Sequence, residues 1–216
     1  MPLKINAPYS EKDIVKAKGG LWSVEEKTWY VPDNTDVNNF LKWMPEGKYS
    51  IIIKTPFYIA VNKRECWKCS QETSVVAIAS NNFYCLDYKN EDAMQWIQLE
   101  GFSFFSMPIY FDEQLTSVIE KLFPFYKIGY SRTVGGKYWA NHCQECSALQ
   151  GDFHLHNEPG EAFCPISIQE CKTLKLVSIP SKFDIKIEAD KSWHSNEEEI
   201  LFHAEKLNLD QYLQLR

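Results

Sequence analysis

Two Cys-x-x-Cys pairs set the tightest limit on how this chain can fold. Cys66 and Cys69 stand in CWKC, after an alternating apolar run, and Cys143 and Cys146 stand in HCQEC, after the strand-like run KYWAN. Two residues between thiolates let each pair chelate one face of a tetrahedral ion through a tight turn. The spacing therefore predicts a single zinc site with four cysteine ligands, in which each pair lies on a knuckle that follows a strand.

The separation of the two pairs is unusual. The 73 residues between Cys69 and Cys143 exceed the range of an ordinary zinc ribbon. Because loop-closure entropy grows only logarithmically with length, a folded insertion is tolerated, and we assign it to residues 88–135. Two unrelated reduced cysteine pairs are the alternative. A redox role is disfavoured because neither pair lies in a thioredoxin-like βαβ unit.

Three histidines crowd the second pair and leave its ligand set open. His142 adjoins Cys143 and can replace a cysteine as ligand, whereas His154 and His156 are expected to share one face of a strand. Four thiolates close the coordination shell, so a zinc ion held by four cysteines stabilises the fold and leaves no position for a reactive water. An open Cys/His site with Asp152 as base would instead make the chain a hydrolase.

The cysteine count and the N-terminus indicate a reducing compartment. Seven cysteines cannot all pair, and MPLKINAPYSEKD lacks the charged segment and apolar core of a signal peptide. No apolar stretch approaches the roughly 20 residues that cross a bilayer. We therefore expect a cytoplasmic protein without a membrane span, in which Cys85, Cys164 and Cys171 are buried thiols.

Charge is spread unevenly along the chain. The net charge is −6, but residues 1–64 hold 10 basic and 7 acidic residues while residues 65–216 hold 13 basic and 22 acidic. Nucleic-acid affinity depends largely on neutralising phosphates with Lys and Arg, so the net negative charge of the whole chain argues against a nucleic-acid-binding function. The acidic residues 65–216 favour a basic protein partner. The mildly basic residues 1–64 remain compatible with a nucleic-acid-binding module.

The first 46 residues read as a compact module. LKIN is a short strand, the segment up to Gly19–Gly20 is a helix, residues 21–31 form a hairpin, and Val37, Phe40, Leu41 and Met44 mark a second short helix. A strand–helix–hairpin–helix unit of this size has little core of its own, so it is expected to pack on the remainder.

Residues 47–216 are predicted to form a zinc-ribbon-like antiparallel β domain. Short β-branched and aromatic runs dominate from Tyr49, with Asn81–Asn82 as a hairpin turn, and DFHLH reads as a further strand. Asp112 caps one helix, and Ser195 with Glu198 forms a capping box for a C-terminal helix that follows one or two strands. The fold class is therefore α+β.

Four residues are candidate contacts for a partner. Arg132 and Lys137 lie in SRTVGGK, which lacks the spacing of a phosphate-binding loop and reads better as a turn that still offers two cations. Trp22 and Trp29 can stack on bases, although core packing is the favoured role for tryptophans in so small a unit.

The segment LKINAPYSEKDIVKAKGGLWSVEEKTWYVP carries a specific pattern at Pro8, Tyr9, Glu11, Lys12, Asp13, Lys16, Ala17, Gly19, Trp22, Lys27, Trp29, Tyr30, Val31 and Pro32. At these positions it resembles a bacterial domain of unknown function that is often attached to plasmid-type primases and other DNA-processing proteins. Gly20 departs from the alanine frequent in that family. The resemblance implies a DNA-processing context and no primase active site.

The segment from Cys66 to Phe163 resembles uncharacterised bacterial proteins that carry two Cys-x-x-Cys pairs. The shared residues include CWKC, Thr73, YSR at 130–132, YWAN at 138–141 and the second pair, followed by GDF and LH at 151–156. This resemblance implies that the two cysteine pairs act together and implies no function.

Taken together, these patterns predict a non-enzymatic, zinc-stabilised binding protein. Its partner is expected to be a protein, for example a toxin that an immunity-type protein neutralises. An accessory nucleic-acid-binding module of a DNA-processing system is the alternative, and a zinc- or thiol-dependent hydrolase is third.

Overall fold

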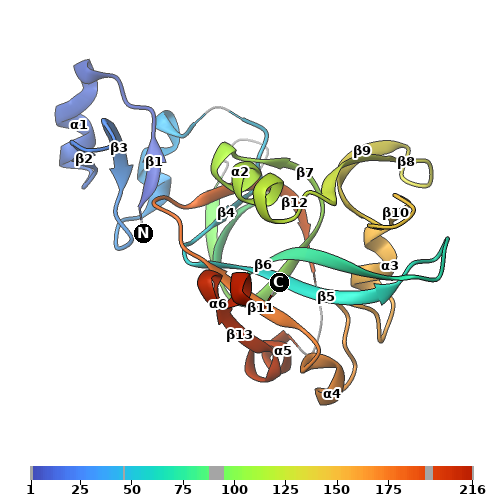
Figure 1. Ribbon diagram of the computed structural model, residues 1–216. Helices are drawn as coiled ribbons and strands as arrows, with labels where there is room; N and C mark the ends of the chain where they lie inside the picture. The colour runs from blue at the N-terminus through green and yellow to red at the C-terminus, as the bar shows by residue number, and fades with distance from the viewer. Residues whose placement is uncertain (1, 46, 88–94, 193–196, 216) are drawn as a thin grey trace.

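The computed structural model describes residues 2–45, 47–87, 95–192 and 197–215 (Figure 1). Strands form three sheets and short helices flank them, which confirms the α+β class. No helix in these ranges is both long and apolar enough to cross a membrane.

The N-terminal module has the predicted order of elements. Its three-stranded sheet has the order β1-β3-β2, where β1 is Leu3–Ile5, β2 is Leu21–Ser23 and β3 is Thr28–Val31. A one-turn η1 (Tyr9–Glu11) leads into α1 (Lys12–Ala17). The second helix is a 3-10 helix, η2 (Val37–Trp43), because its buried residues recur at every third position.

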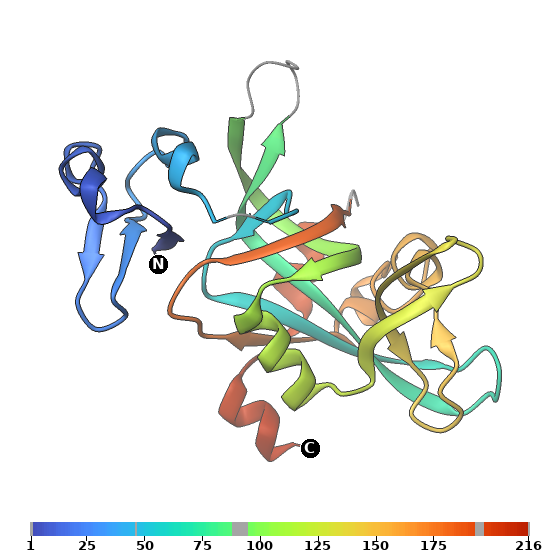
Figure 2. The same ribbon diagram turned by 90° about the horizontal axis from the view of Figure 1, so that it is seen from above.

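The module packs on the rest of the chain, as predicted. Its core continues into Tyr49, Ile52, Tyr84 and Trp96 of the larger unit. Asn38 joins the two parts directly, because its side chain accepts a 2.7 Å hydrogen bond from the N–H of Trp96 and donates a 2.9 Å bond to the same residue's C=O. The two parts therefore share one continuous apolar interior. The module itself lies at the left of Figures 1 and 2.

A curled, largely antiparallel sheet forms the centre of the molecule. Its strands run in the order β13-β11-β5-β6-β4-β12-β7, and β6 also pairs with β7. Because β4 pairs with β6 and β12, and β12 pairs with β7, these four strands close into a ring. The bounds are β4 Ile51–Ile53, β5 Phe57–Glu65, β6 Glu72–Asp87, β7 Gln95–Phe111, β11 Lys175–Ile179, β12 Ile185–Lys191 and β13 Glu205–Asn208.

The prediction that residues 88–135 form an insertion is wrong for the part that the structure describes. Strand β7 pairs with β6 from Asp87↔Gln95 to Ile78↔Phe105 and then with β12, so it is a central part of the sheet. Phe105 and Phe111 enter the main core. The predicted turn at Asn81–Asn82 is also wrong: both residues lie inside the 16-residue β6, where only a register shift marks them.

The helix predicted after Asp112 is confirmed as α2 (Glu113–Leu122). The carboxylate of Asp112 accepts a 3.1 Å hydrogen bond from the N–H of Leu115, which satisfies one free donor of the first turn. Leu115, Ile119 and Leu122 are buried against the ring of strands.

A separate three-stranded sheet follows α2, with β8 Tyr126–Ser131, β9 Gly136–His142 and β10 Leu149–Gln150 in the order β10-β9-β8. The strand predicted over DFHLH is wrong, because these residues form α3 (Asp152–Asn157). Asp152, Leu155 and His156 are its buried residues, and their spacing of three and four is the face of a helix.

The C-terminal part contains two strands, β11 and β12, where one or two were expected, followed by the expected helix, α5 (Glu197–His203). Residues 205–208 instead form β13, parallel to β11, before the final helix α6 (Leu209–Gln214). A four-residue α4 (Ile168–Cys171) precedes β11. The predicted capping residue Ser195 lies outside the described residues.

Candidate metal centre

The four cysteines of the two Cys-x-x-Cys pairs meet at one point. Their Sγ atoms lie within 4.8 Å of one another, and the Cys66–Cys146 and Cys69–Cys143 pairs are each 3.7 Å apart. A tetrahedron with metal–sulfur bonds of about 2.3 Å has edges of about 3.8 Å. The predicted convergence of Cys66, Cys69, Cys143 and Cys146 is therefore confirmed, and the four sulfurs are close enough to hold one metal ion.

The two knuckles have the same backbone geometry. In the first, which joins β5 to β6, the N–H of Cys66 bonds to the C=O of Gln71 and the N–H of Ser70 bonds to the C=O of Cys66, both at 2.9 Å. In the second, between β9 and β10, Cys143 and Ser147 repeat both bonds at 2.9 Å. Ser70 and Ser147 both have φ of +57°. The repeated unit is therefore Cys-x-x-Cys-Ser.

Donors around the sulfurs favour the thiolate form of Cys66, and backbone N–H groups of Cys146 and Glu145 also lower the pKa of Cys143. The pKa of the Cys66 thiol falls to about 6: burial acts to raise it, but backbone N–H groups of Lys68 and Cys69 and the neighbouring thiols of Cys143 and Cys146 outweigh that cost. The Nε2 atom of Gln150 also lies 3.3 Å from this sulfur.

The sulfur of Cys69 resists losing its proton. The N–H of Gln71 acts to lower the pKa of Cys69, yet hydrogen bonds to the other three sulfurs raise this pKa to about 12. Crowded thiols therefore ionise together only when a cation compensates their charge, which is the condition of a metal-binding cysteine cluster.

Hydrogen bonds across the centre join two different sheets. The side chain of Asn141, on β9, accepts a 2.8 Å bond from the N–H of Val76 and donates a 2.9 Å bond to its C=O, on β6. Trp67 Nε1 donates a 2.8 Å bond to the C=O of Leu149. The N–H of Gln144 donates to the hydroxyl of Thr73 at 3.2 Å. The two knuckles thus connect the central sheet to the β8–β9–β10 sheet, and not two halves of one sheet as a zinc ribbon predicts.

The histidines lie outside the sulfur cluster in the described structure. His142 Nδ1 lies 2.9 Å from the C=O of Ala140, and burial lowers the pKa of its imidazole. His154 contacts Glu158 at 2.6 Å on the exposed side of α3. His156 is buried against Phe163 on the other side of that helix. The expectation that His154 and His156 share a strand face is therefore wrong.

The remaining cysteines also lie apart from the sulfur cluster. Cys171 is buried, as predicted, whereas Cys85 and Cys164 are half-buried. Burial raises the pKa of all three thiols, which keeps them protonated and unreactive near neutral pH.

The four candidate contact residues do not form one surface. Trp29 is 5% exposed and belongs to the core of the module, where it meets the 47% exposed Trp22 edge-on at 5.4 Å. Arg132 and Lys137 are exposed at the β8–β9 turn, which confirms that SRTVGGK is a turn. The module and the β8–β9 hairpin lie at opposite ends of the molecule (Figures 1 and 2).

The sequence does not indicate that Gln150 is buried against the sulfur of Cys66, and it marks Asp152 only as the base of an open Cys/His site. Gln150 Oε1 and Asp152 Oδ1 have no hydrogen-bond partner among the described residues. Burial raises the pKa of Asp152 to about 7, against an opposing hydrogen bond from the N–H of Met107. One signal was available: Asp152 opens DFHLH, and an acidic residue is disfavoured in a strand but favoured in the first turn of a helix.

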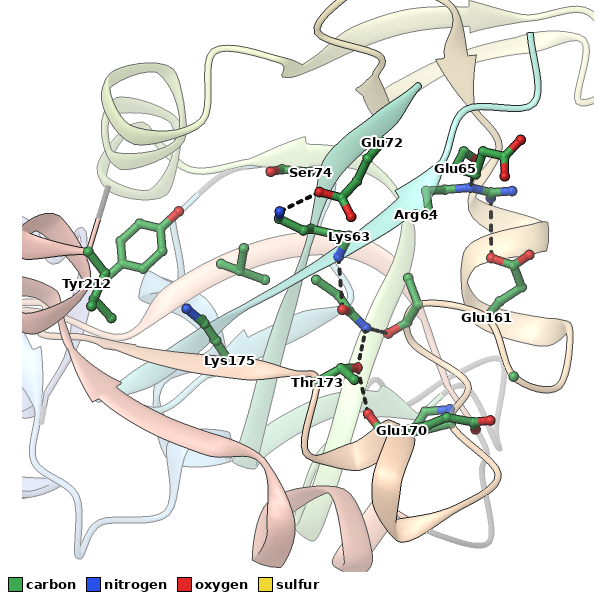
Figure 3. Close-up of a pocket in the computed structure, with 16 residues that line it drawn as sticks. Lys63, Arg64, Glu65, Glu72, Ser74, Glu161, Glu170, Thr173, Lys175 and Tyr212 are labelled. Atoms are coloured by element: carbon green, nitrogen blue, oxygen red, sulfur yellow. Dashed lines mark hydrogen bonds and ion pairs between the residues drawn. The ribbon is translucent and has the colours of Figure 1, made fainter. Parts of the chain in front are cut away.

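A groove of about 860 Å³ lies along β5 and β11 (Figure 3). Its charged groups neutralise one another: Lys63 pairs with Glu72, Arg64 with Glu161 at 3.5 Å, and Lys175 contacts Glu205 at 3.9 Å. Its lining residues include neither cysteine nor histidine. The groove therefore contains none of the residue types that form the cysteine cluster.

Comparison with known proteins locates a relationship at the N-terminus. Residues 3–45 match a family described as a domain of unknown function, DUF5710. Two proteins called DNA primase TraC, both from Escherichia coli, are 49% identical to this chain over 43 and 39 residues, which are 20% and 18% of the chain.

The chain spans 4% and 3% of the length of these two relatives. No solved structure matches the chain. The resemblance of the N-terminal module to a domain found with plasmid primases is thus confirmed over these residues, and the resemblance of the two-cysteine-pair segment to an uncharacterised family remains an expectation.

Proposed function

We propose that this chain is a non-enzymatic binding protein whose shape depends on a structural zinc ion. The observation that carries the proposal is the convergence of Cys66, Cys69, Cys143 and Cys146, with all four sulfurs within 4.8 Å. Zinc and iron–sulfur clusters are the usual occupants of tetrahedral all-sulfur sites. Zinc fits best because the two knuckles offer space for one ion, and a reducing cytoplasm keeps the ligand thiols free.

Four cysteine ligands favour a structural role for the zinc ion over a catalytic one. Four thiolates fill the tetrahedral shell of zinc, so no position is left for water or substrate. The centre joins β6 to β9 and β10, which are also linked by a few hydrogen bonds. Binding of zinc would then contribute on the order of 10 kcal/mol to folding.

A protein partner is the expected ligand. Residues 65–216 hold 22 acidic and 13 basic residues, which favours a basic partner such as a toxin. Cross-linking of the full chain in its host, followed by mass spectrometry, is expected to yield one stoichiometric partner. The Cys143→Ser variant should lose that partner. Retention of the partner by an unfolded, zinc-free variant would contradict a zinc-dependent binding surface.

Metal analysis tests the centre itself. We expect one zinc per wild-type chain, and loss of both zinc and cooperative unfolding in Cys143→Ser. Cys164→Ser is the matched control, because Cys164 is a half-buried cysteine that lies outside the cluster. Wild-type protein without stoichiometric zinc, or a Cys143→Ser variant that keeps zinc and folds normally, would show that the pairing of the two knuckles has no metal-binding role.

An accessory nucleic-acid-binding module is the second candidate. The observation in its favour is the 49% identity to the two TraC primases over 43 and 39 residues of this chain. Against it, residues 1–46 alone hold six basic and seven acidic residues, so the module is not itself basic. Retention on single- or double-stranded DNA that falls steeply between about 50 and 200 mM salt would favour this function over the first.

A further inference from the structure

Strand β8 leaves one edge of its sheet open. It pairs with β9 alone among the described residues, at the end of the order β10-β9-β8. The N–H of His142 bonds to the C=O of Phe125. In an antiparallel pair, the backbone groups of every second residue point toward the partner strand. Because Phe125 points toward β9, Lys127 and Gly129 do so too, and the backbone groups of Ile128 and Tyr130 point away from it. In the described structure, no backbone group bonds to them.

Strand β5 shows how the same chain closes an edge elsewhere. Beyond its pairing with β11, the N–H of Lys63 is satisfied by Asn62 Oδ1 at 2.9 Å, and the C=O of Glu65 accepts from Arg64 Nε at 3.0 Å (Figure 3). Side chains that occupy backbone groups in this way block the addition of another strand. Strand β8 has no such cover in the described residues.

A groove runs beside the open edge. It has a volume of about 540 Å³ and lies between α2 and β8, lined by Thr116, Glu120, Pro124, Tyr126, Lys127, Ile128 and Trp139. Ile128 is 56% exposed and Tyr130 is 59% exposed, which is high for large apolar side chains. In the strand register, Ile128 lies opposite Trp139 and Tyr130 opposite Lys137. On this face of the β8–β9 hairpin, the side chains are therefore apolar at the groove, where Ile128 and Trp139 lie, and cationic toward the turn, where Lys137 lies.

The region around this edge is cationic in an acidic protein. Residues 121–144 contain no Asp or Glu and four cations, Lys121, Lys127, Arg132 and Lys137, although the whole chain has a net charge of −6. Lys127, Arg132 and Lys137 are exposed. A ligand bound along β8 therefore meets a positive electrostatic potential, which the carboxylate of Glu120 lowers at the rim of the groove.

We propose that β8 binds an extended, acidic peptide segment of a partner protein by strand addition. The inference rests on the proposed function, since it supplies a site at which a protein partner is held; a partner that is basic as a whole would present one acidic segment to this local cationic edge, while its basic surface faces the acidic remainder of the chain. The peptide backbone would pair with the N–H and C=O groups of Ile128 and Tyr130, which give the affinity. Its alternate apolar side chains would enter the groove, and its carboxylates would meet Arg132 and Lys137.

A peptide suits this edge better than a nucleic acid does. The edge presents donors and acceptors in alternation, and phosphates supply only acceptors. Phosphates would leave the C=O groups of Ile128 and Tyr130 without partners, whereas a peptide strand satisfies both kinds of group. The cations alone would attract either ligand, so the backbone distinguishes the two.

The test uses the full zinc-loaded chain and three sets of 12-residue peptides. In each set Val, Ile or Tyr alternates with one polar residue, which is Glu in the first set, Ser in the second and Lys in the third. We expect retention in the order Glu, Ser, Lys, and weaker retention at higher salt. Ile128→Pro removes the outward N–H and is tolerated at a free edge. It should weaken binding about tenfold, with zinc content and Tm unchanged.

Two further variants separate the edge from the charge. Lys127→Pro removes an N–H that faces β9, so it should lower Tm, which confirms the assigned direction of the backbone groups. The double variant Arg132→Glu with Lys137→Glu should reverse the preference for Glu over Lys peptides. Lys18→Glu, a distant exposed lysine, is the matched charge control and should leave the preference unchanged.

Three results would overturn the inference. They are an absence of retained peptides at about 100 µM, equal binding by a folded Ile128→Pro variant, or tight binding of a 12-nucleotide oligothymidine at this edge in place of peptides. These failures are distinguishable from failure of the proposed function, because zinc content and cross-linking to a partner are measured on the same variants. A partner retained by Ile128→Pro would leave the binding function and remove β8 from it.

Discussion

The carboxamide of Asn141 pairs with both backbone groups of Val76, at 2.8 Å and 2.9 Å, and so acts as one extra residue of strand pairing between two sheets. Asn141 is fully buried and lies two residues before Cys143 of the second knuckle. A buried amide that satisfies one donor and one acceptor fixes the position of that knuckle relative to β6.

Replacement of this amide should be costly. Asn141→Ala leaves the N–H and C=O of Val76 buried without partners, at about 1–3 kcal/mol for each group. We expect the free energy of unfolding to fall by about 2–4 kcal/mol in urea denaturation. Gln144→Ala is the control, since its side chain makes an exposed 3.3 Å bond to the N–H of Ser74, and it should cost under about 1 kcal/mol. Equal effects of the two variants would assign no special role to Asn141.

Asp152 should make the protein less stable as pH rises. Its pKa is about 7 in the folded protein because the carboxyl is buried, against about 3.9 in the unfolded chain. Between these values the folded state holds one proton more on this group, so the contribution of Asp152 to stability is greatest below about pH 4 and falls until about pH 7. The loss attributable to this group is on the order of a few kcal/mol.

Asp152→Asn removes that ionisation while it keeps an oxygen to accept from Met107. We therefore expect the variant to exceed the wild type in Tm at about pH 8 and to approach it at about pH 4.5. Asp13→Asn, at an exposed carboxyl of the N-terminal module, is the control and should give a pH profile parallel to that of the wild type. A Tm difference that stays constant with pH would show that Asp152 does not titrate in this range.

Asn38 should hold the N-terminal module in place. Asn38→Ala removes both hydrogen bonds to the backbone of Trp96 and should cost about 1–2 kcal/mol. Because the lost bonds join the two parts, proteolysis between the module and β4 should accelerate. Asn39→Ala, at the exposed neighbouring position, should cleave at the wild-type rate. Unchanged cleavage in Asn38→Ala would show that apolar contacts alone dock the module.

Removal of residues 1–46 should leave an unstable remainder. The deletion exposes Tyr49, Ile52, Tyr84 and Trp96, which are buried against the module. A contiguous apolar surface of this kind favours association. Size-exclusion chromatography is therefore expected to show aggregates of residues 47–216. A monomeric remainder with wild-type Tm would establish residue 46 as a true domain boundary.

Local sequence determined the features that a few neighbouring residues specify. The spacing in CWKC and HCQEC predicts two chelating turns, because two thiolates separated by two residues reach one ion only through such a turn. Asp112 with the apolar stripe that follows it predicts α2, because a side-chain acceptor satisfies free N–H groups one turn ahead. The α+β class follows from the same short-range periods.

Only the tertiary structure decided how distant segments combine. Strand β7, assigned to an insertion, pairs along β6 and closes the ring of strands. Asn82 continues β6 because it pairs with Glu100 of β7 and its C=O accepts a hydrogen bond from the N–H of Lys54, while Asn81 is accommodated in the register shift before it. Residues 152–157 form a helix because Leu155 and His156 bury one face against the body of the protein. Pairing between strands far apart in sequence leaves no local period, so the joining of two sheets by Asn141 and four sulfurs appears only once the chain is folded.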